Sequence, residues 1–188
     1  MPARTRDCIV AAFNRLINEK PFDEITVADI AREASVGKTT FYRYFKDRYD
    51  VMNFNYQRIL DALLYDASVT TYRDCFYHLF VSGRRVLSKI QGAFASSGIN
   101  SLEHFIFSYS RDILIRVTRA NRQGAGLTES ERLQADVFCY GVSYMYKNWI
   151  AGKYAVTADQ AADKLFEMLP ESLRYYEFSS EAFAYKAE

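Results

Sequence analysis

The stretch ASVGKTTFYRYFK, residues 34–46, decides how the N-terminal part of this chain folds. A tight turn leads into a segment in which Phe41 and Phe45 stand four residues apart. If a helix begins near Lys38, this spacing places both rings on one inward face together with Val36. Two helices joined by so short a turn are typical of the helix-turn-helix, whose second helix lies in the major groove of DNA.

The outward side chains of this segment have the chemistry for reading DNA. Arg43 can donate a pair of hydrogen bonds to a guanine edge, while Thr39 and Thr40 can bond a base or place a methyl group against thymine. Basic and tyrosine side chains nearby can reach phosphates, and the free N–H groups of a helix that begins at Thr26 can bind another phosphate. The predicted DNA-contacting residues are Thr26, Lys38, Thr39, Thr40, Tyr42, Arg43, Tyr44, Lys46 and Arg48.

The positive charge of this segment is local. The whole chain has 24 Lys and Arg against 23 Asp and Glu, so it is not a polycation that would coat nucleic acid or anionic lipid. Between residues 38 and 48, four cations stand against one anion, Asp47. Charge alone leaves an ordinary solvated helix face as an equal alternative, so the prediction of DNA binding depends on helical phase as well.

Hydrophobic spacing predicts an all-helical chain. A first helix should stop near Lys20, because Pro21 disfavours helix in the residue before it. Thr26 should cap the second helix, with Asp29 completing an imperfect capping box. We therefore predict a three-helix, helix-turn-helix domain over residues 1–48 and a helical bundle for effector binding and dimerisation over residues 49–188. The caps expected for the later helices include Asp47, Thr71, Thr128 and Thr157.

Residues from about 5 to 60 resemble the DNA-binding domain of the TetR family of transcriptional regulators. The resemblance is carried by TVADIA at residues 26–31 and TFYRYFK at residues 40–46. It implies a homodimer that binds a palindromic operator in double-stranded DNA. In that family, DNA is contacted at the positions that match Thr26, Lys38, Thr39, Thr40, Tyr42, Arg43 and Lys46 or Arg48.

The turn departs from the family pattern. Family members often have glycine at the position of Ser35 and serine or threonine at the position of Gly37. Ser35 must then adopt the turn conformation without the freedom of glycine, and Gly37 replaces a better helix cap. We expect a slightly altered turn and a retained site.

The helix expected from Thr128 to about Ala151 is apolar on two sides, so both sides should be buried. A central core helix in a monomer is one explanation. The other is a helix with one face in its own core and one against a second subunit, which the resemblance favours because TetR-like proteins pair through their last two long helices. One stripe contains Phe138, Val142, Met145 and Trp149; the other contains Val137, Tyr140, Gly141 and Tyr144. The predicted dimer interface is Phe138, Gly141, Val142, Met145, Trp149 and Leu165.

Most aromatic residues lie beyond the helix-turn-helix, where they can build the core and line a cavity for an apolar or aromatic ligand. The predicted effector-pocket residues are Phe76, Phe80, Phe105, Tyr109 and Tyr144. These predictions give a repressor that an unknown small molecule releases from DNA. The alternative is a regulator controlled by a partner protein, as in TetR-like regulators of dihydroxyacetone kinase genes, where activation also occurs.

Other classes of protein have little support in the sequence. There is no glycine-rich phosphate loop, no metal-spaced His or Cys cluster and no Gly-x-Ser-x-Gly elbow, so we expect no enzyme, metal or cofactor. Cys8, Cys75 and Cys139 are far apart, as free thiols in a reducing compartment would be. No apolar run approaches the length of a membrane span. We expect a cytoplasmic protein that does not enter a membrane.

Overall fold

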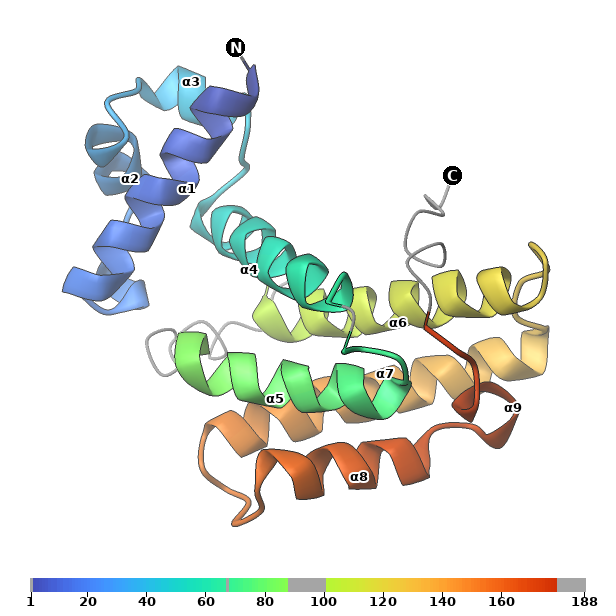
Figure 1. The fold of residues 1–188 in the computed structure, drawn as a ribbon. Coiled ribbons are helices and arrows are strands. Elements are labelled where there is room, and N and C mark those ends of the chain that lie inside the picture. Colours follow the sequence, from blue (N-terminus) through green and yellow to red (C-terminus); the bar gives the residue numbers. More distant parts are fainter. Residues whose placement is uncertain (1, 67, 88–100, 179–188) are drawn as a thin grey trace.

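The computed structural model describes residues 2–66, 68–87 and 101–178, and this part of the chain contains helices but no strand. Figure 1 shows a small head, formed by α1 to α3, and a larger body, formed by α5 to α9, with α4 running between them. The all-helical prediction is confirmed. The elements are α1 Pro2–Glu19, the 3-10 turn η1 Phe22–Glu24, α2 Val27–Glu33, α3 Lys38–Tyr42, α4 Arg48–Leu64, α5 Tyr72–Leu87, α6 Leu102–Asn121, α7 Glu129–Ile150, α8 Ala158–Met168 and α9 Glu171–Arg174.

The head is built around a small aromatic and aliphatic core. Phe13 of α1, Ile30 of α2 and Phe41 of α3 are all buried. Phe22 of η1 closes the core, with its ring edge-to-face against Phe13 at a centroid distance of 6.3 Å. Phe45 is buried beside Phe41, as the four-residue spacing predicts. The three helices of the head are therefore held together by side chains that all lie within one chain.

Helix α2 begins at the predicted cap. The Thr26 hydroxyl accepts a hydrogen bond from the Asp29 backbone N–H, and the Asp29 carboxylate accepts one from the Thr26 backbone N–H, each at 3.1 Å. The ammonium group of Lys20 lies 2.9 Å from the same carboxylate. This ion pair, with the bonds from Thr26, holds the pKa of Asp29 well below its usual range. The capping box is complete although aspartate replaces the more common glutamate.

Helix α4 is attached to both parts of the molecule. The side-chain amides of Asn14 on α1 and Asn55 on α4 donate to each other, at 3.2 and 2.8 Å. At the other end of α4, the Tyr109 hydroxyl of α6 donates to the Asp61 carboxylate at 2.7 Å. A displacement of α4 in the body is therefore a displacement of the head.

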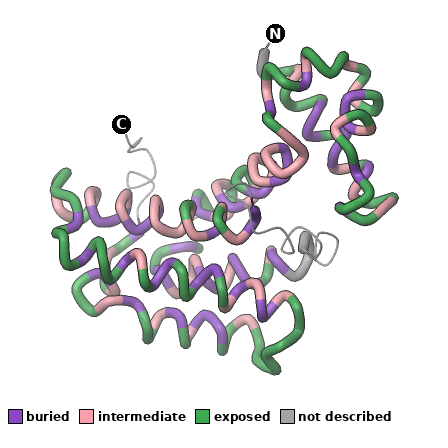
Figure 2. Tube along the Cα trace, turned by 180° about the vertical axis from the view of Figure 1, so that it is seen from behind, coloured by how far each residue is buried: buried purple, intermediate pink, exposed green. Residues whose placement is uncertain are grey.

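The body consists of two closely packed helix pairs. Helix α5 packs along α8, and α6 packs along α7. Figure 2 shows buried residues recurring along these helices on the sides that face one another. The predicted caps Thr128 and Thr157 begin α7 and α8, and each forms a reciprocal capping box. None of the described helices is long and apolar enough to cross a membrane.

Candidate functional site

The turn before α3 places Ser35 in a left-handed backbone conformation, as predicted. Ser35 has a φ of +55°, in the left-handed region that glycine adopts without strain. Gly37 is the N-cap of α3 in an extended conformation and supplies no side-chain hydrogen bond. A Cβ atom added at Gly37 would meet nothing within 4 Å. The turn therefore forms with these two residues exchanged. Ser35 carries backbone strain, and Gly37 caps α3 without a side-chain hydrogen bond.

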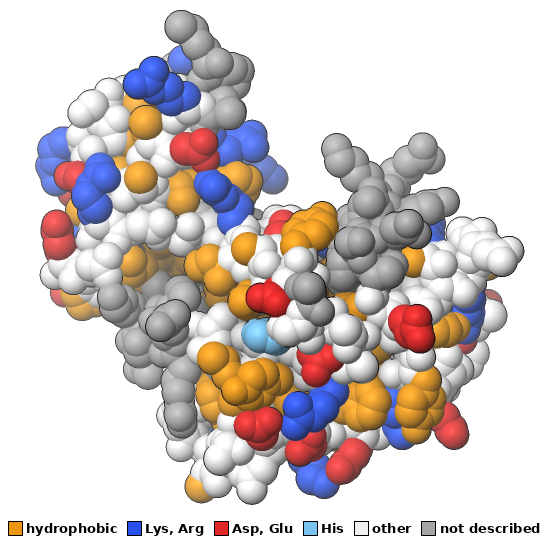
Figure 3. All heavy atoms as spheres, viewed as in Figure 1, with side chains coloured by type: hydrophobic (Ala, Val, Ile, Leu, Met, Phe, Trp, Pro, Cys, Tyr) orange, Lys and Arg blue, Asp and Glu red, His pale blue; other side chains and the backbone are white. Residues whose placement is uncertain are grey.

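The solvent-facing side of α3 and its flanks is polar and basic. Arg43 is exposed, and its Nη2 donates to the Thr40 hydroxyl at 3.1 Å. Thr40 and Tyr44 are half-buried. The remaining predicted contacts in this segment are exposed: Lys38, Thr39, Tyr42 and Lys46. In Figure 3, Lys and Arg side chains are scattered over the head at the upper left.

Arg48 makes contacts within the chain that were not predicted. Its Nη1 lies 2.8 Å from the carbonyl oxygens of both Asp23 and Ile25, and its guanidinium stacks 4.8 Å from the ring centroid of Phe22. These contacts hold one end of the half-buried guanidinium against the C-terminal end of η1. Arg48 therefore stabilises the head through Nη1, and its contact with phosphate stays a prediction.

The structure changes the predicted dimer interface at two residues. Sequence periodicity could not tell which stripe of α7 faces inward, and the packing of α5, α6 and α8 decides it. Val142 and Trp149 are buried in the chain's own core, where Phe80 packs against Trp149 with ring centroids 5.0 Å apart. The other four predicted interface residues, Phe138, Gly141, Met145 and Leu165, line a groove between α7 and α8, and their place in the interface stays a prediction.

The other stripe of α7 is left uncovered in a single chain. Val137 has 76% of its surface exposed, Leu133 66%, Tyr144 61% and Tyr140 60%. Beside this stripe runs a groove of about 1120 Å³ between α7 and α8, lined also by Tyr154, Val156 and Met168. Sequence reasoning identified this second stripe without selecting it for the interface, except at Gly141.

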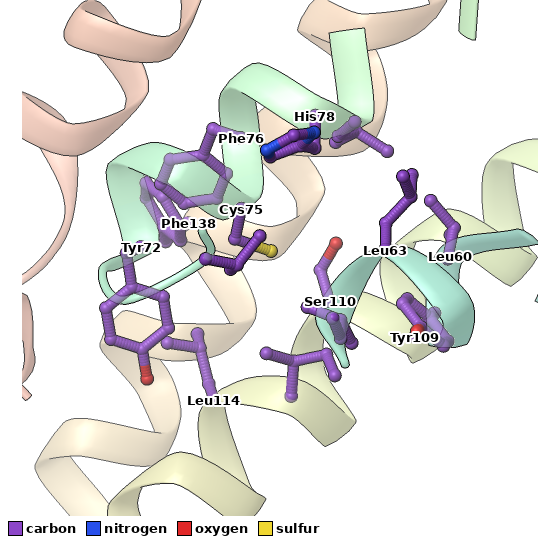
Figure 4. A pocket seen from close by; sticks show the side chains of 14 residues that line it. Leu60, Leu63, Tyr72, Cys75, Phe76, His78, Tyr109, Ser110, Leu114 and Phe138 are labelled. Carbon is purple, nitrogen blue, oxygen red and sulfur yellow. The ribbon is translucent and has the colours of Figure 1, made fainter. Parts of the chain in front are cut away.

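A small cavity lies in the body where α4, α5 and α6 meet. Its volume is about 40 Å³, and its walls are mostly aliphatic and aromatic. Figure 4 shows the Cys75 sulfur and the Ser110 oxygen directed toward the space between these helices, with the His78 ring at its edge. Burial raises the pKa of the Cys75 thiol to about 12, so the thiol stays protonated. The cavity therefore has a mostly apolar lining, with the His78 ring at its edge.

Two of the five predicted pocket residues, Phe76 and Tyr109, line this cavity. Phe80 instead packs against Tyr146 and Trp149, and Phe105 lies between Tyr56 and Tyr109. Tyr144 faces outward on α7. Sequence reasoning missed the aliphatic lining from the end of α4, namely Leu60, Leu63 and Leu64. Their helical spacing marks an inward face, but the helix that they meet is fixed only by long-range packing.

Comparisons with known proteins agree with this arrangement of head and body. The family described as "Bacterial regulatory proteins, tetR family" matches residues 9–53. An uncharacterized HTH-type transcriptional regulator of Haemophilus influenzae is 47% identical over 45 residues, which span 23% of this chain and 22% of that protein. The sequence match is thus confined to the head and the first turns of α4.

Solved structures resemble nearly the whole chain. The dihydroxyacetone kinase operon activator DhaS has a TM-score of 0.59 at 16% identity, over 92% of this chain and 98% of its own. The fatty acid degradation regulator FadR of Bacillus halodurans has a TM-score of 0.53 at 17% identity, over 90% and 96%. The repressor QsdR of R. erythropolis, from the TetR family, has a TM-score of 0.55 at 18% identity, over 89% and 93%.

These structural likenesses show the fold of the body, and the sequence match identifies the head. Both agree with the helix-turn-helix geometry of α2 and α3. Residues 9–53 thus match the tetR family of bacterial regulatory proteins, and the fold of nearly the whole chain is similar to that of solved transcriptional regulators.

Proposed function

We propose that this regulator is a dimeric repressor whose heads bind a palindromic operator and are released by a small-molecule effector. The observation that carries the proposal is the solvent-facing side of α3, where Thr39 and Arg43 are exposed while Phe41 is buried. In this arrangement Arg43 and the threonines read base edges, while Lys38, Tyr42 and Lys46 contact phosphates. At the amino end of α2, the N–H groups of Thr26 and Asp29 are bonded within the capping box, and those of Val27 and Ala28 remain to meet a further phosphate.

The exposed stripe of α7 supports the dimer. Val137, Leu133, Tyr140 and Tyr144 form an apolar surface larger than isolated exposed residues would give, and such surfaces in soluble proteins mark contact sites. We infer that α7 and the adjacent groove along α8 meet the same elements of a second copy. A two-fold pair places the two α3 helices roughly 34 to 36 Å apart, or a multiple of that distance, to match successive major grooves.

We place the effector in the cavity between α4, α5 and α6. Pockets for ligands of drug size measure about 300–1,000 Å³, whereas this cavity holds about 40 Å³. A ligand can therefore enter only if the last turns of α4 move away from α5 and α6. Because α4 carries the head, that movement changes the spacing of the two α3 helices. Coupling of this kind is typically about 1–3 kcal/mol, and operator DNA must weaken effector binding by the same factor.

The small cavity also favours the alternative, in which a partner protein contacts the body. The fold resembles that of an activator as well as that of a repressor. A purified partner that binds in a fixed ratio and changes operator affinity without any small molecule would favour this alternative. Effector titrations that leave operator affinity unchanged would exclude the ligand-released repressor.

Operator DNA for these tests can be recovered from genomic fragments by selection with the full chain. Arg43→Ala should cost about 1–3 kcal/mol of binding free energy and relax the base preference at one position, whereas Lys46→Ala should weaken all sequences alike. Lys153→Ala, at an exposed lysine in the loop between α7 and α8, is the control and should bind as wild type does. Equal affinity of Arg43→Ala and wild type for operator and random DNA would exclude α3 as the reading element.

A further inference from the structure

Two buried tyrosine hydroxyls join α4 to α7 through the centre of the body. Tyr56 of α4 and Tyr146 of α7 have 1% and 0% of their surface exposed, and their hydroxyl groups are hydrogen-bonded to each other. The Tyr146 hydroxyl also donates to the backbone carbonyl of Leu79 on α5, at 3.3 Å. Either hydroxyl can donate in the bond between the two rings; when Tyr146 donates its single proton to Leu79, Tyr56 supplies the proton of that bond.

The surroundings of this pair are apolar. Phe105 packs against Tyr56 and Phe80 against Tyr146, with ring centroids 6.0 and 5.6 Å apart. Burial raises the pKa of both phenols, so neither ionises at physiological pH. The pair is thus a neutral hydrogen-bonded chain that runs from α4 through α7 to α5 inside a hydrophobic core.

Gly83 makes room for this chain. A Cβ atom at Gly83 would lie 2.0 Å from the Tyr146 hydroxyl oxygen and 2.7 Å from its Cζ atom. Glycine inside a helix costs about 1 kcal/mol relative to alanine, and Gly83 lies well inside α5. The helix therefore carries a destabilising residue at a point where any larger side chain would collide with the Tyr146 hydroxyl.

A buried hydroxyl pair contributes little to stability when compared with two phenylalanines of the same shape, because the gain of the hydrogen bond is offset by dehydration. What such a pair does supply is a fixed geometry, since both hydroxyls are satisfied only in one relative position of the helices. Here the helices are α4, which is fastened to the head through Asn55 and Asn14, and α7, which carries the exposed Val137 stripe.

We propose that Tyr56 and Tyr146 are positioning residues that fix the DNA-reading head at a set distance from the α7 face. The proposal rests on the proposed function, in which α7 lies at the two-fold axis and the spacing of two heads selects a palindrome. The two residues touch no DNA. They act by keeping α4 in register with α7, so that both heads meet their half-sites together.

The test compares Tyr56→Phe and Tyr146→Phe with Tyr72→Phe. Tyr72 is a matched control, because its ring is equally buried in the body while its hydroxyl has no hydrogen-bond partner among the described residues. Each variant is titrated with the complete operator and with an isolated half-site. We expect both pair variants to bind the half-site as wild type does and the complete operator about tenfold more weakly, while Tyr72→Phe behaves as wild type on both.

A second measurement does not depend on DNA. Cys8 of the head is exposed, whereas the pKa of both Cys75 and Cys139 is raised by burial to about 12, so a thiol-reactive spin label should modify Cys8 selectively. A second label at Tyr175→Cys, on the exposed end of α9, reports the distance from head to body. In chains diluted with unlabelled protein, the distance distribution should be narrow in wild type and broader in Tyr56→Phe.

The two measurements separate the possible failures. A wild-type chain that binds no operator contradicts the proposed function, and the distance distribution then decides the positioning role alone. An unchanged ratio of complete-site to half-site affinity in Tyr56→Phe, together with an unchanged distance distribution, overturns the positioning role. A loss of half-site binding in the pair variants would also overturn it, because the head itself would then be damaged.

Discussion

The head and the body of this molecule expose opposite kinds of surface. The head buries Phe41 and Phe45 and exposes Arg43 and its polar neighbours, so its core is complete within one chain. The body buries one apolar stripe of α7 and leaves the other, around Val137, in contact with solvent. We infer that the head buries its apolar side chains within a single chain, whereas the exposed apolar stripe of the body is buried only when a second molecule covers it.

The largest expected effect tests whether the exposed stripe of α7 in the body is the dimer interface. Val137→Asp places a charge in the centre of the exposed stripe, and a buried charge without a partner costs about 3–5 kcal/mol. The dimer dissociation constant, measured by sedimentation equilibrium, should therefore rise roughly 100-fold or more. Val81→Asp, at a half-exposed valine of α5 outside the groove, is the control. If Val137→Asp sediments as wild type does, the α7 stripe is not the interface.

The second effect concerns the stability of the head. Arg48→Ala removes a cation that is bonded to the carbonyls of Phe22, Asp23 and Ile25, and hydrogen bonds to charged groups are worth about 1.5–3 kcal/mol. The free energy of unfolding of the head should fall by about that amount, so the head should unfold at a lower denaturant concentration. Arg58→Ala, which breaks an exposed ion pair between α4 and Asp7 of α1, should cost less than about 1 kcal/mol. Equal losses in both variants would contradict the structural role of Arg48.

The third effect sharpens the description of the turn. Ser35→Gly should stabilise the head by about 1 kcal/mol, because a left-handed conformation costs other residues about 1–2 kcal/mol. Gly37→Ser should add a few tenths of a kcal/mol as an N-cap, since the site has open space. Gln123→Gly should relieve the same kind of backbone strain in the body, because Gln123 has a φ of +52° just after α6. Chemical denaturation measures all three, and a loss of stability in Ser35→Gly would show that the serine side chain supports the turn.

A further prediction concerns acid stability in the body. The Arg122 guanidinium, bonded to the Glu131 carboxylate at 2.6 and 2.9 Å, lowers the pKa of Glu131 to about 2. Because the folded pKa is depressed, this contribution is present above pH 4.5 and is lost as the pH falls toward 2. Glu131→Gln should flatten the pH dependence of unfolding in that window. Glu129→Gln, at an exposed position in the same turn of α7, is the control.

The head was predictable because its determinants are local. Thr26 with Asp29 fixes the beginning of α2, and Phe41 with Phe45 fixes which side of α3 faces inward. The caps of α7 and α8 were equally readable, since a capping box involves residues only three apart. Such features need no knowledge of the rest of the fold.

Other features were less predictable, because they depend on segments that are distant in the sequence. Both stripes of α7 are apolar, so only the packing of α5, α6 and α8 shows that Trp149 faces inward and Val137 outward. Arg48 has the charge and the position of a phosphate contact, and only the three-dimensional closeness of η1 reveals its acceptors. The bond between Tyr56 and Tyr146 spans 90 residues and leaves no mark in the sequence pattern.

The place of Arg48 has a consequence for how binding should respond to salt. If Arg48 stays on the backbone of η1 and Arg43 reads a base edge, Lys38 and Lys46 are the two cations between residues 38 and 48 that neutralise phosphates. A pair of heads then contributes four such charges from this segment, and the logarithm of the association constant should fall against the logarithm of the salt concentration with a slope of about −3.6. A protein in which Arg48 also met a phosphate would respond to salt more steeply, by close to two further units of slope for the pair.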